Sequence, residues 1–525
     1  MKIYYPTLLA LVIGLVTNAQ DLTSTMHVSA GTPVYVSVAT TVSTDQINLK
    51  STSNQFSTLF LNEDLDPSIV VNYDRYINII GTLGMNGGND LISMPVKTSG
   101  VVTVNDFLGY TDGTTINSSI IPNSPTLETM YAFGPYNNST QSYENFDTAI
   151  DGNVEIRRGV GYRAASHSGQ TVRFTGLVST LTESVDISSN ANGWNLVGNP
   201  YPTYLNSLQF LSHNAAVLNP SATAIYGYNS GTYVGEGPGS FGNFTVINNL
   251  TNSNSIIAPG QGFLVANNPD NLNGQVSFTM AMRSFNGTDD FVLGRSSSTN
   301  EMLRLKVVNN SAEYATEIYF NENSTRGLDP GYDAANFDGL SSNLLLYSQL
   351  VENNTGENMA IQSLDFDSQN NVIIPLGLKA NQGEEITFSI DSMTLPDTYD
   401  VYLEDNLTNT FTLLNNENYS FVPQTNIDGT GRFFLRLGTD ALSIDDVEGK
   451  NLYISAQDQT VYIRGLLFAD SQVFIYDIQG RLVNKTNLKE GSNLNSIRTN
   501  NLSSGIYVVK LSNIMHEQTE KVILR

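Results

Sequence analysis

The acidic residues that could hold a metal ion gather at one turn of the chain. Asp329-Pro-Gly-Tyr-Asp333 places two carboxylates four residues apart, and Asp338 follows shortly after. Carboxylate and backbone carbonyl oxygens are the ligands that Ca²⁺ prefers. The spacing makes Asp329, Asp333 and Asp338 candidate calcium ligands, and it indicates no other cofactor. The alternative is an aspartate-rich turn held by its own side-chain-to-backbone hydrogen bonds.

Aromatic residues form a second group with a candidate role in binding. Exposed rings stack on sugar rings or bind partner proteins, whereas aromatic residues in strands more often pair within a core. Both interpretations stay open for five tyrosines in two aromatic segments: Tyr131, Tyr136, Tyr226, Tyr228 and Tyr233. The single tryptophan, Trp194, enters an apolar strand. We therefore predict that Trp194 is buried.

No motif of a catalytic centre stands out, so we assign no catalytic residue and lean towards a protein that is not an enzyme. Gly237-Pro-Gly-Ser-Phe-Gly242 fits a G-x-G-x-x-G pattern, but the strand-like Asn243–Ile247 follows where a dinucleotide site needs a helix. Paired acids occur, yet a glycosidase needs two carboxyl groups on opposite sides of a sugar, which a sequence does not show. The four histidines lie far apart and form no HExxH or HxH motif: His27, His167, His213 and His516.

Composition narrows the class of protein. The 525 residues include 42 glycines and only 14% charged residues, and the formal net charge is −25. Such a profile is typical of turn-rich β structure, and a field of this sign disfavours nucleic acid and anionic membranes. The chain has no cysteine, which excludes a disulfide framework, a cysteine nucleophile and a zinc–thiolate site.

The N-terminus resembles a secretory signal peptide over residues 1–19. Lys2 supplies the positive charge, Leu8–Val16 forms the apolar core, and Thr17-Asn18-Ala19 is a small-residue cleavage site. The apolar run is too short to span a membrane. No other stretch approaches ~20 apolar residues, so we expect no membrane span in the mature chain.

Residues 75–290 contain an internal duplication. DLISMPV from Asp90 matches NLVGNPY from Asn195, and GVGYRA from Gly159 matches GQGFLV from Gly260. A third pair of segments, around Phe174 and Phe278, keeps the same order. The shifts are 195 − 90 = 105, 260 − 159 = 101 and 278 − 174 = 104. We predict two related β modules, at 75–183 and 184–290, after an N-terminal β segment at 20–74.

Short strand signals continue through the rest of the chain. From Glu301 to Gly438 they recur at intervals of 8–15 residues, including LRLKVV, VIIPLGL and RFFLRL. This spacing predicts a jelly-roll-like β-sandwich at 299–440. The fold class that we predict is all-β: tandem β-sandwich or jelly-roll-like modules, with an immunoglobulin-like sandwich at the C-terminus.

The last eighty residues carry the most specific pattern. A hairpin around Gly480 and Arg481 is followed by a strand with Gly505 and Tyr507, and then by the terminal strand Glu520–Arg525, which contains Lys521. The order and spacing of these pieces resemble the type A sorting domain of type IX secretion cargo from Bacteroidetes. The resemblance covers residues 447–525. It departs at Asp446–Lys450, where members of the family often have a Pro-Asn-Pro-like segment.

This resemblance implies a route of export. It also implies that the sorting-signal residues are Gly480, Arg481, Gly505, Tyr507, Lys521 and Arg525. The type IX machinery would be the partner, and the protein would pass through the periplasm and be secreted or held at the outer cell surface. GWNLVGNPYP from Gly193 resembles a segment of adhesin-like surface proteins of the same bacteria. We expect a non-enzymatic protein that serves adhesion or binds a glycan or protein. The alternatives are an extracellular polysaccharide hydrolase and a structural spacer of a surface layer.

Overall fold

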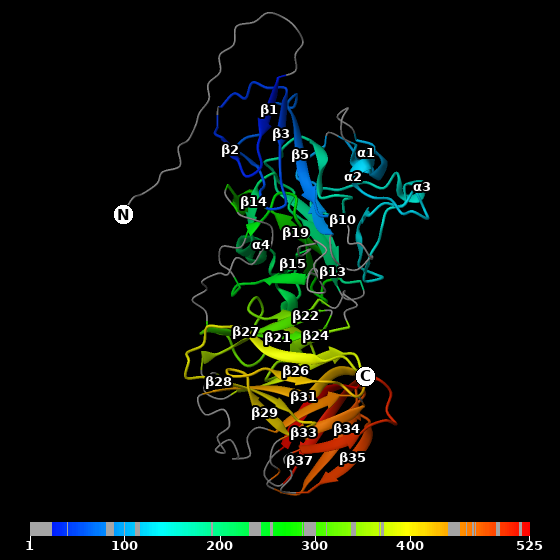
Figure 1. Cartoon of the computed structure of the whole chain (residues 1–525), viewed down its shortest axis with the longest axis vertical. Coiled ribbons are helices and arrows are strands. Elements are labelled where there is room, and N and C mark those ends of the chain that lie inside the picture. Colours follow the sequence, from blue (N-terminus) through cyan, green and yellow to red (C-terminus); the bar gives the residue numbers. More distant parts are fainter. Residues whose placement is uncertain are drawn as a thin grey trace, which may run out of the picture.

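The protein is an elongated stack of β modules, as expected of the all-β class (Figure 1). The N-terminal strands lie at one end of the stack and the C-terminal sandwich at the other. The computed structural model describes residues 24–38, 40–79, 89–98, 100–110, 116–190, 193–229, 243–251, 256–285, 287, 301–310, 312–337, 343–366, 368, 372–438, 452–457, 459–464, 467, 469–489, 494–513 and 517–524. The expected signal peptide lies outside these residues, as does the Gly237–Gly242 segment.

The N-terminal segment folds as short parallel ladders. One ladder joins β1 (Thr25–Val28), β3 (Gln46–Leu49) and β5 (Val70–Ile77), and a second joins β2 (Pro33–Val36) to β4 (Thr58–Leu61). Alternate residues of β5, such as Val71, Tyr73 and Ile77, enter the core. The expected boundary between residues 74 and 75 falls inside β5. The segment is therefore continuous with the module that follows it.

The two modules of the predicted duplication have the same strand order and register. In the first repeat, β5 pairs with β11 (Gln170–Gly176) and β6 (Asp90–Ser93) pairs with β10 (Gly161–Ala164). In the second, β12 (Glu183–Ser188) pairs with β19 (Asn273–Phe278) and β13 (Trp194–Gly198) pairs with β18 (Gly262–Ala266). Tyr162 lies opposite Ile92, as Phe263 lies opposite Val197. Pro95 and Pro200 both follow two residues after their strand, so their places are equivalent.

Insertions between these strands differ between the repeats. Each contains a helix capped by a polar side chain: Thr103 caps α1 (Val104–Leu108), and Asn206 caps α4 (Ser207–Asn214). The first repeat adds α2 (Asn117–Ile120), β7 (Phe133–Gly134), β8 (Tyr136–Asn137), β9 (Ser142–Tyr143) and α3 (Thr148–Asp151). The second adds β14 (Tyr204–Asn206), η1 (Pro220–Ala222), β15 (Ile225–Asn229), β16 (Asn243–Ile247) and β17 (Ile256–Ile257), and is followed by η2 (Met280–Met282) and β20 (Arg283–Ser284).

A β-sandwich of eleven described strands follows, in the region where a jelly-roll-like domain is predicted. Its central strand, β26, is buried along nearly all its length because VIIPLGLKA is apolar on both faces. β26 pairs with β31 on one side and with β24 on the other. The strands are β21 (Glu301–Val308), β22 (Glu313–Phe320), β23 (Ala334–Ala335), β24 (Leu345–Ser348), β25 (Met359–Leu364), β26 (Val372–Ala380), β27 (Ile386–Met393), β28 (Asp400–Asp405), β29 (Thr410–Leu413), β30 (Tyr419–Phe421) and β31 (Ile427–Gly438).

The chain ends in a small two-sheet sandwich. One sheet has the order β35-β34-β37-β38, and β32, β33 and β36 form the other ladder. The strands are β32 (Tyr453–Gln457), β33 (Thr460–Arg464), β34 (Ser471–Asp477), β35 (Leu482–Leu488), β36 (Leu494–Arg498), β37 (Gly505–Ser512) and β38 (Glu517–Leu524). Seven strands agree with the immunoglobulin-like prediction. Within the described ranges, no helix is long and apolar enough to cross a membrane.

Candidate functional site

The described residues among the predicted sorting-signal set lie in one sheet of the C-terminal sandwich and in the hairpin that joins two of its strands. Gly480 has φ of +77° at the tip of the β34–β35 hairpin, a conformation that favours glycine. The carboxylate of Asp477 accepts hydrogen bonds from the backbone N–H of Arg481 at 3.0 Å and from its Nε at 2.7 Å. These contacts, the backbone one first, lower the pKa of Asp477. The hairpin is therefore fixed by its own residues.

The terminal strand completes this sheet as predicted. Gly505 pairs with Leu524 across β37 and β38, and Val522 and Leu524 are buried. The hydroxyl of Tyr507 donates to the carbonyl oxygen of Ser503 at 2.8 Å, while its ring lies in the core. Lys521 is exposed on β38. Arg525 lies outside the described residues.

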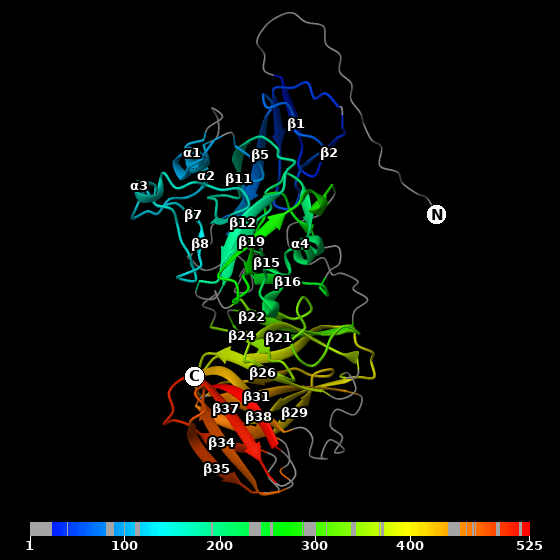
Figure 2. The same cartoon turned by 180° about the vertical axis from the view of Figure 1, so that it is seen from behind.

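An export signal that must reach its receptor is expected to make few contacts with the rest of the chain. The C-terminal sandwich is instead docked on the preceding domain, which corrects that expectation (Figure 2). Gly429 of β31 pairs with Gln457 of β32, and the Thr430 hydroxyl donates to the carbonyl oxygen of Ala456 at 3.3 Å. A void of ≈ 40 Å³, lined among others by Asp428 and Lys521, remains between the domains. The pairing of β31 with β32 thus joins a strand of one domain to a strand of the next. No local sequence pattern predicts this pairing.

Three of the five candidate binding tyrosines are buried, which favours the core interpretation of these three over the binding one. Tyr226 is 0% exposed, and Tyr136 and Tyr228 are 9% exposed each. The Tyr226 hydroxyl donates to the carbonyl oxygen of Ala335 at 2.6 Å. These rings belong to the core cluster that joins the repeats to the β-sandwich. Burial also raises the pKa of the Tyr228 phenol.

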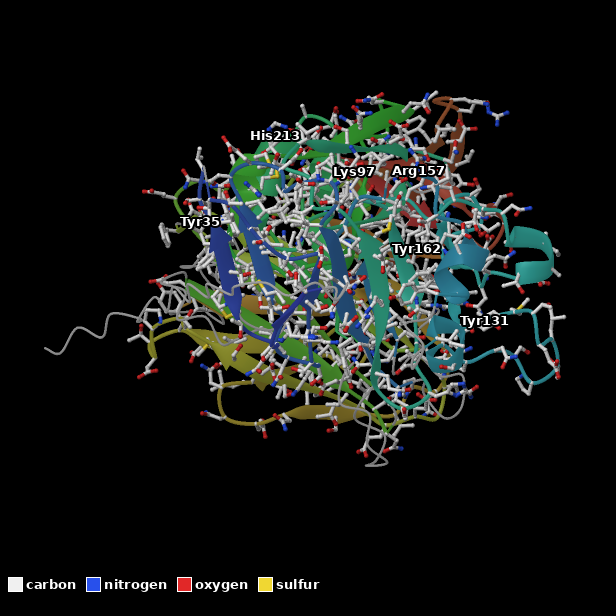
Figure 3. The ribbon with its side chains drawn as sticks, turned by 90° about the horizontal axis from the view of Figure 1, so that it is seen from above. Tyr35, Lys97, Tyr131, Arg157, Tyr162 and His213 are labelled. Atoms are coloured by element: carbon white, nitrogen blue, oxygen red, sulfur yellow. The ribbon has the colours of Figure 1, made fainter. Side chains whose placement is uncertain are left out.

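The other aromatic predictions have mixed outcomes. Tyr131 is half-buried against the first core, on the outer side of the first repeat and away from Tyr35 (Figure 3). Tyr233 lies outside the described residues. Trp194 is 5% exposed, so its predicted burial is confirmed. Its ring packs edge-on against Tyr226 at 4.6 Å and Phe337 at 4.9 Å between centroids.

The acidic turn is held together by hydrogen bonds from its own residues and one neighbouring strand. The Asp333 carboxylate accepts from the backbone N–H groups of Ser363 and Asp329, each at 2.6 Å, and from the Ser363 hydroxyl at 2.9 Å. Asp329 accepts in turn from the N–H of Thr325 at 2.6 Å. Burial raises the pKa of Asp333 to about 7. Asp338 lies outside the described residues, and calcium at this turn stays a prediction.

A cluster of hydrogen-bonded polar groups, of which Asn48, Asn72 and Asp74 are buried, lies on the polar face of the β1-β3-β5-β11 sheet. Asn72 donates to Asn48 at 2.7 Å and accepts from the Thr175 hydroxyl at 2.7 Å, which joins three strands. Two residues further along β5, the Asp74 carboxylate forms an ion pair with Arg173, whose Nη2 lies 2.8 Å from Oδ2. The same carboxylate also forms an ion pair with Lys50. The hydrogen bonds to Asp74 raise the pKa of Arg173. These cross-strand rows hold the polar face rigid.

A hollow of ≈ 400 Å³ opens at the end of this polar face. It is lined by Ser51, Thr52, Ser53, Tyr76, Ile120, Gly169, Gln170 and Thr171. Among these described lining residues there is no carboxylic acid. Tyr76 is not among the site residues predicted from the sequence, although the alternation of Asn72, Asp74 and Tyr76 with Val71, Tyr73 and Ile77 indicates a polar face of the strand. The other residues that line the hollow come mostly from loops and β11, and no sequence pattern indicates that they lie beside Tyr76.

Comparison with known proteins adds two family matches. Residues 114–437 match a family described as a domain of unknown function (DUF8693), and residues 442–525 match the secretion system C-terminal sorting domain. No curated protein matches the chain. A solved structure described as a biofilm associated protein, BSP domain, is similar over 87% of this chain and 95% of its own, at 10% identity and a TM-score of 0.19. A likeness at this level does not establish a shared fold.

Proposed function

This chain belongs to the DUF8693 family and is exported by the type IX secretion system to the cell surface or the extracellular space, and we propose that it acts there as a non-enzymatic binding protein. The observation that supports binding is the hollow beside the polar face of the first sheet. It is lined in part by Tyr76 of β5, and β5 lies in the half of the molecule opposite the sorting domain (Figure 1). A protein held at the surface by its C-terminal end would present this face outwards.

The chemistry of the hollow supports binding over hydrolysis. Hydrolysis of a glycosidic bond uses two carboxyl groups on either side of the sugar. The residues described around the hollow offer hydroxyl, amide and aromatic groups instead. Such groups orient a ligand through hydrogen bonds and ring contact but do not activate water.

The test uses the full chain on a panel of polysaccharides and glycoproteins, with two readouts on each. We expect retention of at least one member of the panel and no release of new reducing ends. Turnover with reducing-end release would show a hydrolase. A chain that neither binds nor cleaves any member would be a spacer, and the proposal would fall.

A further inference from the structure

We propose that the hollow at Tyr76 is a binding site for a neutral oligosaccharide. This inference rests on the proposed binding function and names the ligand class. It is carried by three features of the same place: a preformed shape, a ring beside uncharged hydrogen-bonding groups, and sheet edges that leave no room for a peptide strand.

The shape of the hollow is fixed by the backbone. The Ser51 hydroxyl donates to the carbonyl oxygen of Asp74 at 2.7 Å and accepts from the N–H of Tyr76 at 2.8 Å. Thr52 closes a turn through its N–H, which donates to the Gln55 carbonyl at 2.8 Å. The loop that forms one wall is thus tied to β5. A preformed site of this kind loses little conformational entropy when a ligand binds.

The opposite wall depends on a glycine. Gly169 has φ of +68°, and a Cβ built on it would lie 2.5 Å from the Tyr76 hydroxyl. Its N–H donates to the Ser166 hydroxyl oxygen at 2.9 Å. Since no side chain fits there, the Tyr76 ring lies directly against the backbone at the start of β11. Thr171 is the cross-strand partner of Tyr76 and belongs to the same face.

The exposed groups match a sugar better than a charged ligand. Thr52, Ser53 and Gln170 are exposed at the rim, and the Tyr76 side chain is half-buried between them. The lining residues carry no formal charge, and the whole chain has a net charge of −25, which repels polyanions. Hydroxyl and amide groups beside one aromatic ring suit a ligand with many hydroxyls and apolar ring faces. The volume of ≈ 400 Å³ lies within the range of small-ligand sites.

A peptide strand fits this place poorly. β5 is paired on both sides, with β3 and with β11. At the free side of β11, the Asn117 side chain accepts from the N–H of Arg173 at 2.9 Å and donates to its carbonyl oxygen at 3.0 Å. Addition of a strand needs both of these backbone groups. The free edge of β11 is therefore blocked at Arg173, two residues from Thr171 of the hollow.

The experiment is affinity electrophoresis of the full chain in gels that contain mannan, xylan, a mixed-linkage β-glucan or, as the anionic comparison, polygalacturonate. Two variants test the site: Tyr76→Ala removes the ring, and Gln170→Ala removes an exposed amide without disturbing the core. Tyr35→Ala is the matched control, because Tyr35 is a 51% exposed tyrosine on β2, in the other ladder of the same segment. Thermal melting checks that each variant folds.

We expect retardation by at least one neutral polysaccharide and none by polygalacturonate. Tyr76→Ala and Gln170→Ala should each weaken this binding about tenfold, the factor expected for the loss of one good contact. Tyr35→Ala should bind like the unaltered chain. If a neutral polysaccharide retards both variants as strongly as the unaltered chain, this site is overturned while the binding function stays in place. Failure of all three neutral polysaccharides, or retardation by polygalacturonate alone, would overturn the ligand class.

Discussion

The backbone N–H of Ser93 donates to the carbonyl oxygen of Gly260 at 2.8 Å, and the same contact occurs in reverse between Gly198 and Gly159, also at 2.8 Å. Ser93 corresponds to Gly198 (198 − 93 = 105) and Gly159 to Gly260 (260 − 159 = 101). The β-bridges Ile92–Gln261 and Val197–Val160 are a second pair of contacts in which equivalent residues of the two repeats exchange roles. Contacts that recur with the roles of the two partners exchanged are those of a two-fold interface. The two repeats are thus related as the halves of a dimer within one chain.

This interface predicts the effect of a methyl group at its centre. A Cβ on Gly198 would lie 2.4 Å from the Ser93 Cβ and 2.9 Å from the Gln261 carbonyl oxygen. We expect Gly198→Ala to lower the free energy of unfolding by ~1–3 kcal/mol, the usual cost of overpacking. Chemical denaturation measures the change.

Gly100→Ala is the control, since nothing lies within 4 Å of a Cβ built at that position. It should change stability by less than about 0.5 kcal/mol, as other surface substitutions do. If both variants unfolded alike, the close approach of the repeats at Gly198 would be refuted.

Trp194 tests the joint between the second repeat and the β-sandwich. Its ring packs against Tyr226 of the repeat and against Phe337 of the sandwich. We expect Trp194→Ala to cost ~3–5 kcal/mol, because truncation of a large buried ring leaves a cavity. Trp194→Phe, which keeps an aromatic ring, should cost less. Melting that is unchanged in the alanine variant would contradict a core role for this residue.

Asp333 predicts how stability depends on pH. Burial raises its pKa from 3.8 to about 7. Between these values the folded chain holds a proton that the unfolded chain has released, so stability falls as pH rises from about 4 to 7. Relative to Asp333→Asn, the unaltered chain should lose on the order of a few kcal/mol of unfolding free energy over this window. Denaturation of both chains at pH 4, 5.5 and 7 measures the difference, and a constant difference would show that Asp333 does not titrate there.

Deletion of residues 447–525 tests the sorting role. β31 keeps its partners β26 and β28 without the C-terminal sandwich, so the upstream domains should stay folded. Cell fractionation should find the truncated chain in the periplasm. In the reciprocal experiment, residues 447–525 fused to a reporter with a signal peptide should carry it out of the cell. A truncated chain that reaches the surface would refute the sorting role.

Much of the fold could be predicted because strands leave a local pattern. Leu303–Val308, Val372–Leu378 and the terminal strand alternate or run apolar, and each forms a strand. The duplication could be predicted because its apolar anchors keep their order. Its two-fold interface could not be predicted. The local sequence around a glycine such as Gly198 does not show that Ser93, about a hundred residues away, packs against it.

The candidate sites were predicted less well, for a physical reason. A tyrosine in a hairpin has the same local sequence whether its ring faces solvent or another domain, and the packing of Phe337 against Trp194 and Tyr136 decided the outcome. The hollow at Tyr76 combines a loop, a strand and a positive-φ glycine from three separate segments. The β5–β11 pairing brings the glycine to the strand, and the hydrogen bonds of Ser51 bring the loop to it.

Binding of a fluorescent neutral polysaccharide to whole cells tests surface-displayed binding most directly, because such a polymer does not enter an intact cell. The polysaccharide would be the one that retards the purified chain. Cells that produce the full chain are compared with cells that produce equal amounts of the chain without residues 447–525. We expect fluorescence on the first and none on the second, because the truncated chain stays inside. Equal labelling of both, or no labelling of either, would contradict a binding protein that the C-terminal domain delivers to the surface.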